Sequence, residues 1–160
     1  MKKETHTLIN NIHRCFAVEF NNTAMDYFER ENRTQEDIDD MIGYAHSALH
    51  HWKIFSGGTN ANVQRGEYVI AKAYGLAGNK AEAISHAKRC FELTEKHPEE
   101  MKDFDFVFAN EIMAFVNKSE GNEVEFKKYR AKAEKSGNEI RDEEDREFYF
   151  DVFNKYIKTY

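Results

Sequence analysis

The stretch that decides the fold is Gly-Asn-Lys-Ala-Glu-Ala at residues 78–83, because a similar stretch, Gly-Asn-Glu-Val-Glu-Phe, returns 43 residues later at positions 121–126. Each copy stands between two segments whose apolar residues recur at helical spacing, so each predicts a turn between two helices. Repeated helix–turn–helix units stack side by side, and such stacks usually bind other molecules. The repeat therefore favours a binding protein over an enzyme.

Composition supports a single helical domain. The chain has 160 residues, of which 41% are hydrophobic, and this is enough apolar material for one continuous core. It contains one proline and eight glycines, and no alternating strand pattern persists. We therefore expect an all-α fold of about seven helices arranged as antiparallel hairpins.

Charge and apolar patterning exclude several classes of partner. The net charge is −6 and no run of Lys and Arg occurs, which argues against nucleic acid. No apolar stretch approaches the roughly 18 residues that a membrane-spanning helix needs. Glu4 and His6 interrupt any apolar signal segment after Met1. We expect a cytoplasmic protein with no membrane partner and no cofactor.

The two cysteines carry no recognisable site. Cys15 and Cys90 are far apart and match neither metal nor redox spacing. Both fall on apolar helix faces, so we expect two buried free thiols.

Apolar spacing and turn residues divide the chain into seven predicted helices. Thr34 is a predicted N-cap, with Asp37 completing a capping box. The whole chain, 1–160, is one helical-repeat domain. It comprises a degenerate first hairpin (5–55), two repeat hairpins (60–96 and 103–135) and a C-terminal helix (140–160).

The C-terminal helix has an unusually wide aromatic face. Phe148, Tyr149, Phe153, Tyr156 and Tyr160 all fall within about half of its circumference. Such a helix either caps the stack or forms a homodimer with a second copy of the chain. Capping is the favoured interpretation, because terminal repeats are commonly modified in this way.

Residues 60–136 resemble tetratricopeptide repeats. Ala71, Tyr74, Gly78 and Ala83 match that family in type and spacing, whereas Glu67 stands where the family has its signature tryptophan. The second copy matches at Ala114, Gly121 and Ala133 and departs at Asn117 and Phe126. The 43-residue spacing also exceeds the family's repeat of about 34 residues. Residues 45–47, 51–52, 62 and 65 are also similar to those of small bacterial proteins of this type, a likeness that supplies no function.

The resemblance implies a right-handed stack in which the first helix of each hairpin lines a concave surface. Asn and Arg side chains on that surface commonly hold a peptide backbone or a terminal carboxylate. We therefore predict a polar groove that binds a peptide or protein partner, lined by Asn62, Arg65, Tyr68, Asn110, Glu111 and Trp52. Each assignment has a structural alternative: Asn62 caps its helix, Arg65 pairs with Asp105, and Trp52 fills the core.

A histidine stripe supports a second hypothesis. His46 and His50 are four residues apart and share a helix face with Asp39, a set that could ligate a divalent metal ion. With His51 they could form a metal-binding, small-molecule-binding or hydrolytic site. The alternative is a solvated helix face, because the sequence lacks the metalloprotease motif. We favour the non-catalytic hypothesis.

Overall fold

The computed structural model describes residues 3–158, of which Lys3, Ile157 and Lys158 are described by their backbone alone. Within this range there is no strand, which confirms the all-α prediction. Residues 159–160, expected at the end of the last helix, lie outside the described range. The helices are α1 (Lys3–Phe28), α2 (Gln35–Ile54), α3 (Asn60–Leu76), α4 (Lys80–Lys96), α5 (Asp103–Ser119), α6 (Glu123–Asn138) and α7 (Glu143–Phe153), with a 3₁₀ turn η1 (Pro98–Glu100) and a final π-helical segment η2 (Asn154–Lys158).

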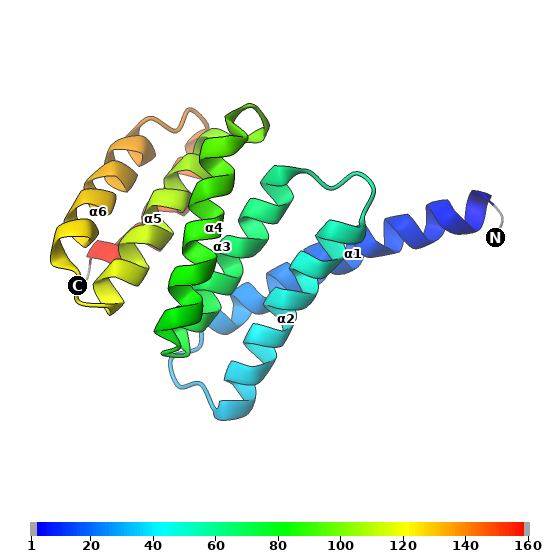
Figure 1. Cartoon of the computed structure of the whole chain (residues 1–160), viewed down its shortest axis with the longest axis horizontal. Helices are drawn as coiled ribbons and strands as arrows, with labels where there is room; N and C mark the ends of the chain where they lie inside the picture. Colours follow the sequence, from blue (N-terminus) through cyan, green and yellow to red (C-terminus); the bar gives the residue numbers. More distant parts are fainter. Residues whose placement is uncertain (1–2, 159–160) are drawn as a thin grey trace.

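Neighbouring helices pair as antiparallel hairpins (Figure 1). Helix α1 packs on α2, α3 on α4, and α5 on α6, and the hairpins are joined by contacts of α3 with α2 and of α5 with both α4 and α3. In Figure 1, α1 continues well beyond its crossing with α2. None of the helices in the described range is long and apolar enough to cross a bilayer.

The two repeated turns adopt the same conformation. Gly78 and Gly121 have φ of 78° and 77°, a left-handed backbone that strongly favours glycine. In each turn the next residue, Asn79 or Asn122, donates its backbone N–H to the carbonyl five residues earlier at 2.9 Å. The side chain of the same asparagine then accepts the N–H three residues later, at 3.4 and 3.3 Å. One Gly-Asn pair therefore ends one helix and begins the next in both copies.

Side-chain caps also define the starts of α2 and α3. Thr34 and Asp37 form the predicted capping box, in which each side chain accepts the backbone N–H of the other. Thr59 and Asn62 form a second box at the start of α3. Both boxes satisfy N–H groups that have no partner within the helix.

Small side chains allow the hairpins to approach closely. Ala71, Ala73, Ala83 and Ala87 are all fully buried. Gly137 allows a still closer approach, since a Cβ at this position would overlap the ring of the fully buried Tyr149. Helix α7 therefore docks on α6 through a glycine.

The centre of the stack holds a buried ion pair between α3 and α5. Lys72 Nζ lies 2.7 Å from Glu111 Oε1, and these side chains are 1% and 0% exposed. The ammonium also lies over the rings of Phe115 and Tyr156, at 4.4 and 3.9 Å from their centroids. Aromatic faces attract cations, so the rings replace part of the lost hydration.

The C-terminal segment packs within its own chain. Tyr149, Phe153 and Tyr156 are buried, and the Tyr156 hydroxyl donates to the Phe28 carbonyl at 3.1 Å. Lys155 forms an ion pair with Glu29 beside that contact. The chain thus returns from α7 to the end of α1. Its aromatic face covers the side of α3 and α5 on which Lys72 and Glu111 lie.

The cysteine prediction is correct for one residue and wrong for the other. Cys90 is buried and free, whereas Cys15 is exposed. Cys15 lies on α1, whose fully buried positions are others, such as Ala17 and Ala24.

The glycine contact gives a test of how α7 docks. We expect Gly137→Ala to lower the free energy of unfolding by about 1–3 kcal/mol, because the added methyl group overpacks against Tyr149. Gly43→Ala is the matched control: its Cβ would meet nothing within 4 Å, and it should stabilise α2 by about 0.5–1 kcal/mol. Urea denaturation measures both. Equal effects of the two substitutions would contradict the close approach of α7 to α6.

The buried ion pair gives a second test. Lys72→Met leaves the Glu111 carboxylate without its partner, and we expect a loss of about 3–5 kcal/mol in the free energy of unfolding. The double variant with Glu111→Leu should recover most of this loss, because no charge then remains buried. Chemical denaturation of the wild-type protein, both single variants and the double variant completes the cycle. Additive losses in the double variant would show that the two groups are not coupled.

Candidate partner-binding site

A small pocket lies on the face formed by the first helices of the hairpins and bounded by α7. Its volume is about 150 Å³, and most of its wall is apolar or aromatic. Its lining residues are Asn21 and Met25 of α1; Gln64, Arg65, Tyr68 and Val69 of α3; Phe104, Asp105 and Phe108 of α5; and Phe148 and Val152 of α7. Two of the six predicted partner-binding residues, Arg65 and Tyr68, are among them.

Arg65 is held in place by a buried carboxylate. Its Nε and Nη2 donate to the two carboxylate oxygens of Asp105, both at 2.8 Å, and the guanidinium carbon lies 4.9 Å from the centroid of the Phe104 ring. Asp105 is 1% exposed and also accepts the backbone N–H of Lys102. The Arg65 side chain remains 37% exposed, and its Nη1 bonds to no described residue. The Arg65–Asp105 pair, the structural alternative for Arg65, therefore forms, and it leaves Nη1 of this pocket-lining residue without a partner among the described residues.

Tyr68 lines this pocket, whereas Glu111 is fully buried behind it. Tyr68 packs edge to face on Phe108, with ring centroids 5.2 Å apart. Burial, and then the nearby Glu111 carboxylate, raise the pKa of Tyr68 well above 10.0, so its hydroxyl stays neutral. Glu111 is fully buried against Lys72. Glu111 was predicted to line a surface groove, and this prediction is wrong: the residue forms an ion pair inside the chain.

Lys72 is a buried charged residue that the sequence analysis did not single out. Burial lowers its pKa, and Glu111 opposes that shift. The sequence contained a signal for Lys72, because this residue follows Arg65 by seven positions and so lies on the same face of the helix.

Asn62 and Trp52 lie away from the pocket. Asn62 accepts hydrogen bonds from the backbone N–H and hydroxyl of Thr59, at 3.0 and 3.1 Å, so it caps α3 as the alternative interpretation predicted. Trp52 is partly buried and packs edge to face on Phe55, with ring centroids 6.2 Å apart. Neither residue lines the pocket beside Arg65.

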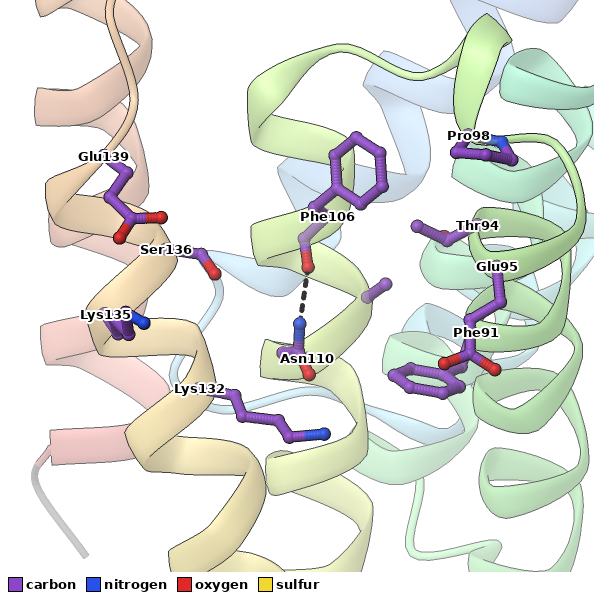
Figure 2. A pocket seen from close by; sticks show the side chains of 11 residues that line it. Phe91, Thr94, Glu95, Pro98, Phe106, Asn110, Lys132, Lys135, Ser136 and Glu139 are labelled. Atoms are coloured by element: carbon purple, nitrogen blue, oxygen red, sulfur yellow. Dashed lines mark hydrogen bonds between the residues drawn. The ribbon is translucent and has the colours of Figure 1, made fainter.

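Asn110 lies in a different and larger cleft, between α4 and α6 with α5 as its floor (Figure 2). The volume of this cleft is about 600 Å³. Asn110 Nδ2 donates to the Phe106 carbonyl at 2.8 Å, while its buried Oδ1 has no partner among the described residues. Asn110 and Arg65 therefore belong to separate surfaces.

Of the three histidines of the alternative hypothesis, His50 and His51 have ring centroids 6.0 Å apart, whereas His46 contacts other residues. His46 Nε2 lies 3.0 Å from the Tyr74 hydroxyl, and its ring meets His86, whose Nδ1 is 2.5 Å from the buried Glu67 carboxylate. His51 instead faces α1, where it contacts His13. Sequence analysis did not identify Glu67–His86, because its partners are separated by 19 residues.

An imidazole pair joins the first two helices. Nδ1 of His13 and Nδ1 of His51 are 2.8 Å apart, so one ring donates and the other accepts. Two protonated rings would have only donors at this contact. The pair therefore requires at least one neutral imidazole.

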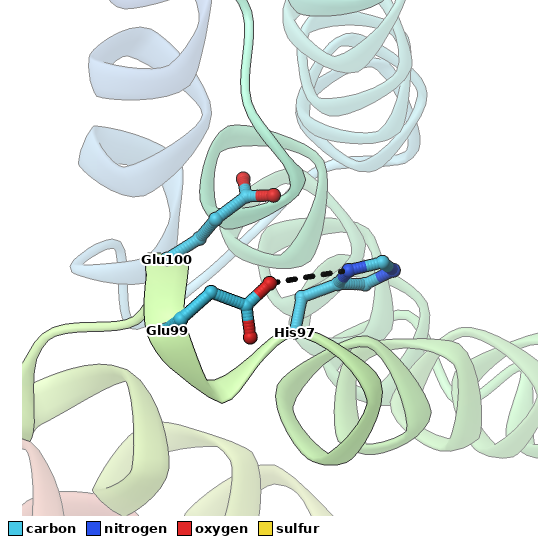
Figure 3. Close-up of side chains that lie close together, drawn as sticks. All are labelled: His97, Glu99 and Glu100. Carbon is cyan, nitrogen blue, oxygen red and sulfur yellow. Dashed lines mark ion pairs between the residues drawn. The ribbon is translucent and has the colours of Figure 1, made fainter.

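One group of side chains in the described part of the chain brings together possible metal ligands: His97, Glu99 and Glu100 (Figure 3). Glu100 is already engaged, because it accepts the side-chain and backbone N–H groups of Asn60, both at 2.7 Å. These hydrogen bonds lower its pKa. Glu100 thus anchors the start of α3, and a metal ion would have to compete with that contact. His46 and His50 are not in this group.

Comparison with known proteins assigns no family and no function to the chain. No protein-family model matches the chain, and no curated protein or solved structure matches it significantly.

The histidine contacts predict a pH dependence of stability. Burial, and then neighbouring histidines, lower the pKa of His46 and of His51 below 6.5. The unfolded chain therefore binds protons more tightly, and the free energy of unfolding should fall as pH drops below about 6.5. His51→Gln should flatten this decline, measured by urea denaturation from pH 8 to pH 5. Parallel curves for the two proteins would contradict a contribution of the His13–His51 contact.

Proposed function

We propose that the protein is a non-catalytic interaction scaffold, a tetratricopeptide-like helical repeat that binds a peptide or protein partner in the cytoplasm. The supporting observation is the position of Arg65 on a buried carboxylate, at the edge of an apolar pocket. Two nitrogens of the guanidinium are used by Asp105, and Nη1 remains for a partner. The ion pair keeps this donor oriented before a partner arrives, which reduces the entropy lost on binding.

The volume of the pocket beside Arg65 indicates what kind of group can enter it. Sites for drug-sized ligands usually measure about 300–1,000 Å³. The pocket beside Arg65 measures about 150 Å³, which suits one apolar side chain. Aromatic rings of Tyr68, Phe104 and Phe108 supply the contact area, and anchors in such desolvated pockets often dominate binding energy.

The bound partner would therefore present an apolar side chain beside a main-chain carbonyl or a carboxylate. The side chain fills the pocket, and the oxygen accepts from Arg65 Nη1. A charge-assisted hydrogen bond of this kind is stronger than a neutral one. Binding in this way breaks no covalent bond, and the proposed protein is therefore a scaffold.

Filling the pocket tests the proposal. Val152 lines it from α7, and Val152→Trp should block entry of the partner's side chain while keeping Arg65 and Asp105 intact. We expect proteins captured from extract of the native host by the immobilised wild-type protein to bind at least about 10-fold more weakly to this variant, as expected for an anchor worth about 1.4 kcal/mol or more. Quantitative mass spectrometry of the captured proteins gives the ratio.

Val124→Trp is the matched control, because Val124 is 76% exposed on α6 and lies in neither pocket. Circular dichroism shows that each variant is folded. Equal capture by the wild-type protein and Val152→Trp would exclude the pocket as the binding site.

A further inference from the structure

We propose that the N-terminal half of α1 is the interface through which two copies of this chain form a symmetric dimer. The surface concerned, called the α1 stripe below, consists of Leu8, Ile9, Ile12 and Phe16. These four large hydrophobic side chains are 61%, 39%, 39% and 43% exposed. The α1 stripe shares no residue with the lining of the pocket beside Arg65.

Helical spacing places the members of the α1 stripe on one side of the helix. At about 100° per residue, the four positions fall within an arc of about 100°. The fully buried Ala17 and Ala24 lie outside this arc, so the α1 stripe is a face that packing within the chain leaves exposed. The terminal hairpin of a helical stack normally carries polar residues where no further hairpin covers it, and the α1 stripe departs from that rule.

The first part of α1 extends past the end of its neighbour. Asn10 Oδ1 accepts the backbone N–H of Ser56 at 2.8 Å, and Ser56 comes after the end of α2 at Ile54. Figure 1 shows α1 continuing beyond this region, away from the rest of the stack. Leu8 is accordingly the most exposed member of the α1 stripe. A short helix is only marginally stable alone in water, so packing against another surface would stabilise this projection.

The distribution of charge favours a second copy of the chain on the α1 stripe. Residues beside a two-fold axis meet their own counterparts, so a charged residue there would face a like charge. The α1 stripe contains no charged residue. An antiparallel contact centred on Ile12 would place Leu8 opposite Phe16 of the second copy, and one such contact would cover both stripes.

The composition of α1 argues against a membrane surface as the alternative. Helices that lie on membranes are typically rich in Lys and Arg on their polar face, which attracts anionic lipids. Residues 4–28 contain one arginine, Arg14, and no lysine, against the three acidic residues Glu4, Glu19 and Asp26. This segment is therefore acidic, and anionic lipids would repel it.

The area of the α1 stripe sets the strength of the dimer. The exposed parts of its four side chains amount to roughly 300 Å² of apolar surface per copy. Because interfaces are about 56–65% apolar, two such stripes correspond to a total buried area of about 1,000 Å². This area is close to the lower limit for specific association. We therefore expect a reversible dimer with a dissociation constant of about 1–100 µM.

Sedimentation equilibrium at protein concentrations from about 1 to 200 µM measures the dissociation constant. Ile12→Lys places a charge where the two copies meet, and it should raise this constant about 10-fold or more. Val18→Lys is the matched control, because Val18 is 41% exposed on the same helix and lies about 120° around it from Ile12. The control should change the constant less than about 2-fold. Circular dichroism shows that both variants are folded.

Cross-linking of Cys15 is an independent readout. This thiol is exposed on α1, three residues after Ile12, whereas Cys90 is buried. A short bismaleimide, which adds one thiol at each end, should therefore join two wild-type copies. Cys15→Ser and Ile12→Lys should each abolish the covalent dimer, and Val18→Lys should retain it.

Three results would overturn the proposal. The first is a wild-type protein that remains monomeric at about 200 µM, well above the expected dissociation constant. The second is a dimer that Ile12→Lys and Val18→Lys weaken equally. The third is a monomer that co-sediments with phosphatidylcholine vesicles and loses this binding with Ile12→Lys, which would assign the α1 stripe to a lipid surface.

Discussion

The buried ion pair between Lys72 and Glu111 is the constraint on which the arrangement of the other elements depends. A charge in the interior is tolerated only when it has partners, and here α3 supplies the cation and α5 the anion. Tyr156 and Phe115 then cover the ammonium, which requires the C-terminal segment to lie over these two helices. On that side of the stack, α7 also bounds the pocket of about 150 Å³ beside Arg65.

The central helix α5 separates the pocket beside Arg65 from the cleft that contains Asn110. Asp105 and Phe108 face α3 and α7, where Arg65 stands at the pocket. Asn110 faces α4 and α6, where the cleft is larger and its walls are charged. Adjacent residues on a helix point about 100° apart, so Asn110 and Glu111 do not share a surface although they are neighbours in sequence.

Local contacts were the most predictable part of this protein, and distant contacts the least. The capping box of Thr34 and Asp37 was predicted because its partners are three residues apart. The Arg65–Asp105 pair was foreseen only as one of two alternatives, because its partners are separated by 40 residues. The contacts of His86 with Glu67 and of His13 with His51 gave no local signal. Cys15 was expected to be buried, yet it is exposed, since apolar spacing alone does not show which part of a helix face is covered.

By itself, the sequence determined the helices and their turns. The Gly-Asn pairs at 78–79 and 121–122 specify a left-handed residue followed by a cap, and these depend on the backbone of a few consecutive residues. Only the tertiary structure decided which polar residues remain exposed and which contact each other. Glu111 became an internal ion-pair partner and Asn62 a cap, while Asn110 kept a buried oxygen without a partner. The physical reason is that burial depends on how the helices pack together, and this packing brings together residues about 40 positions apart.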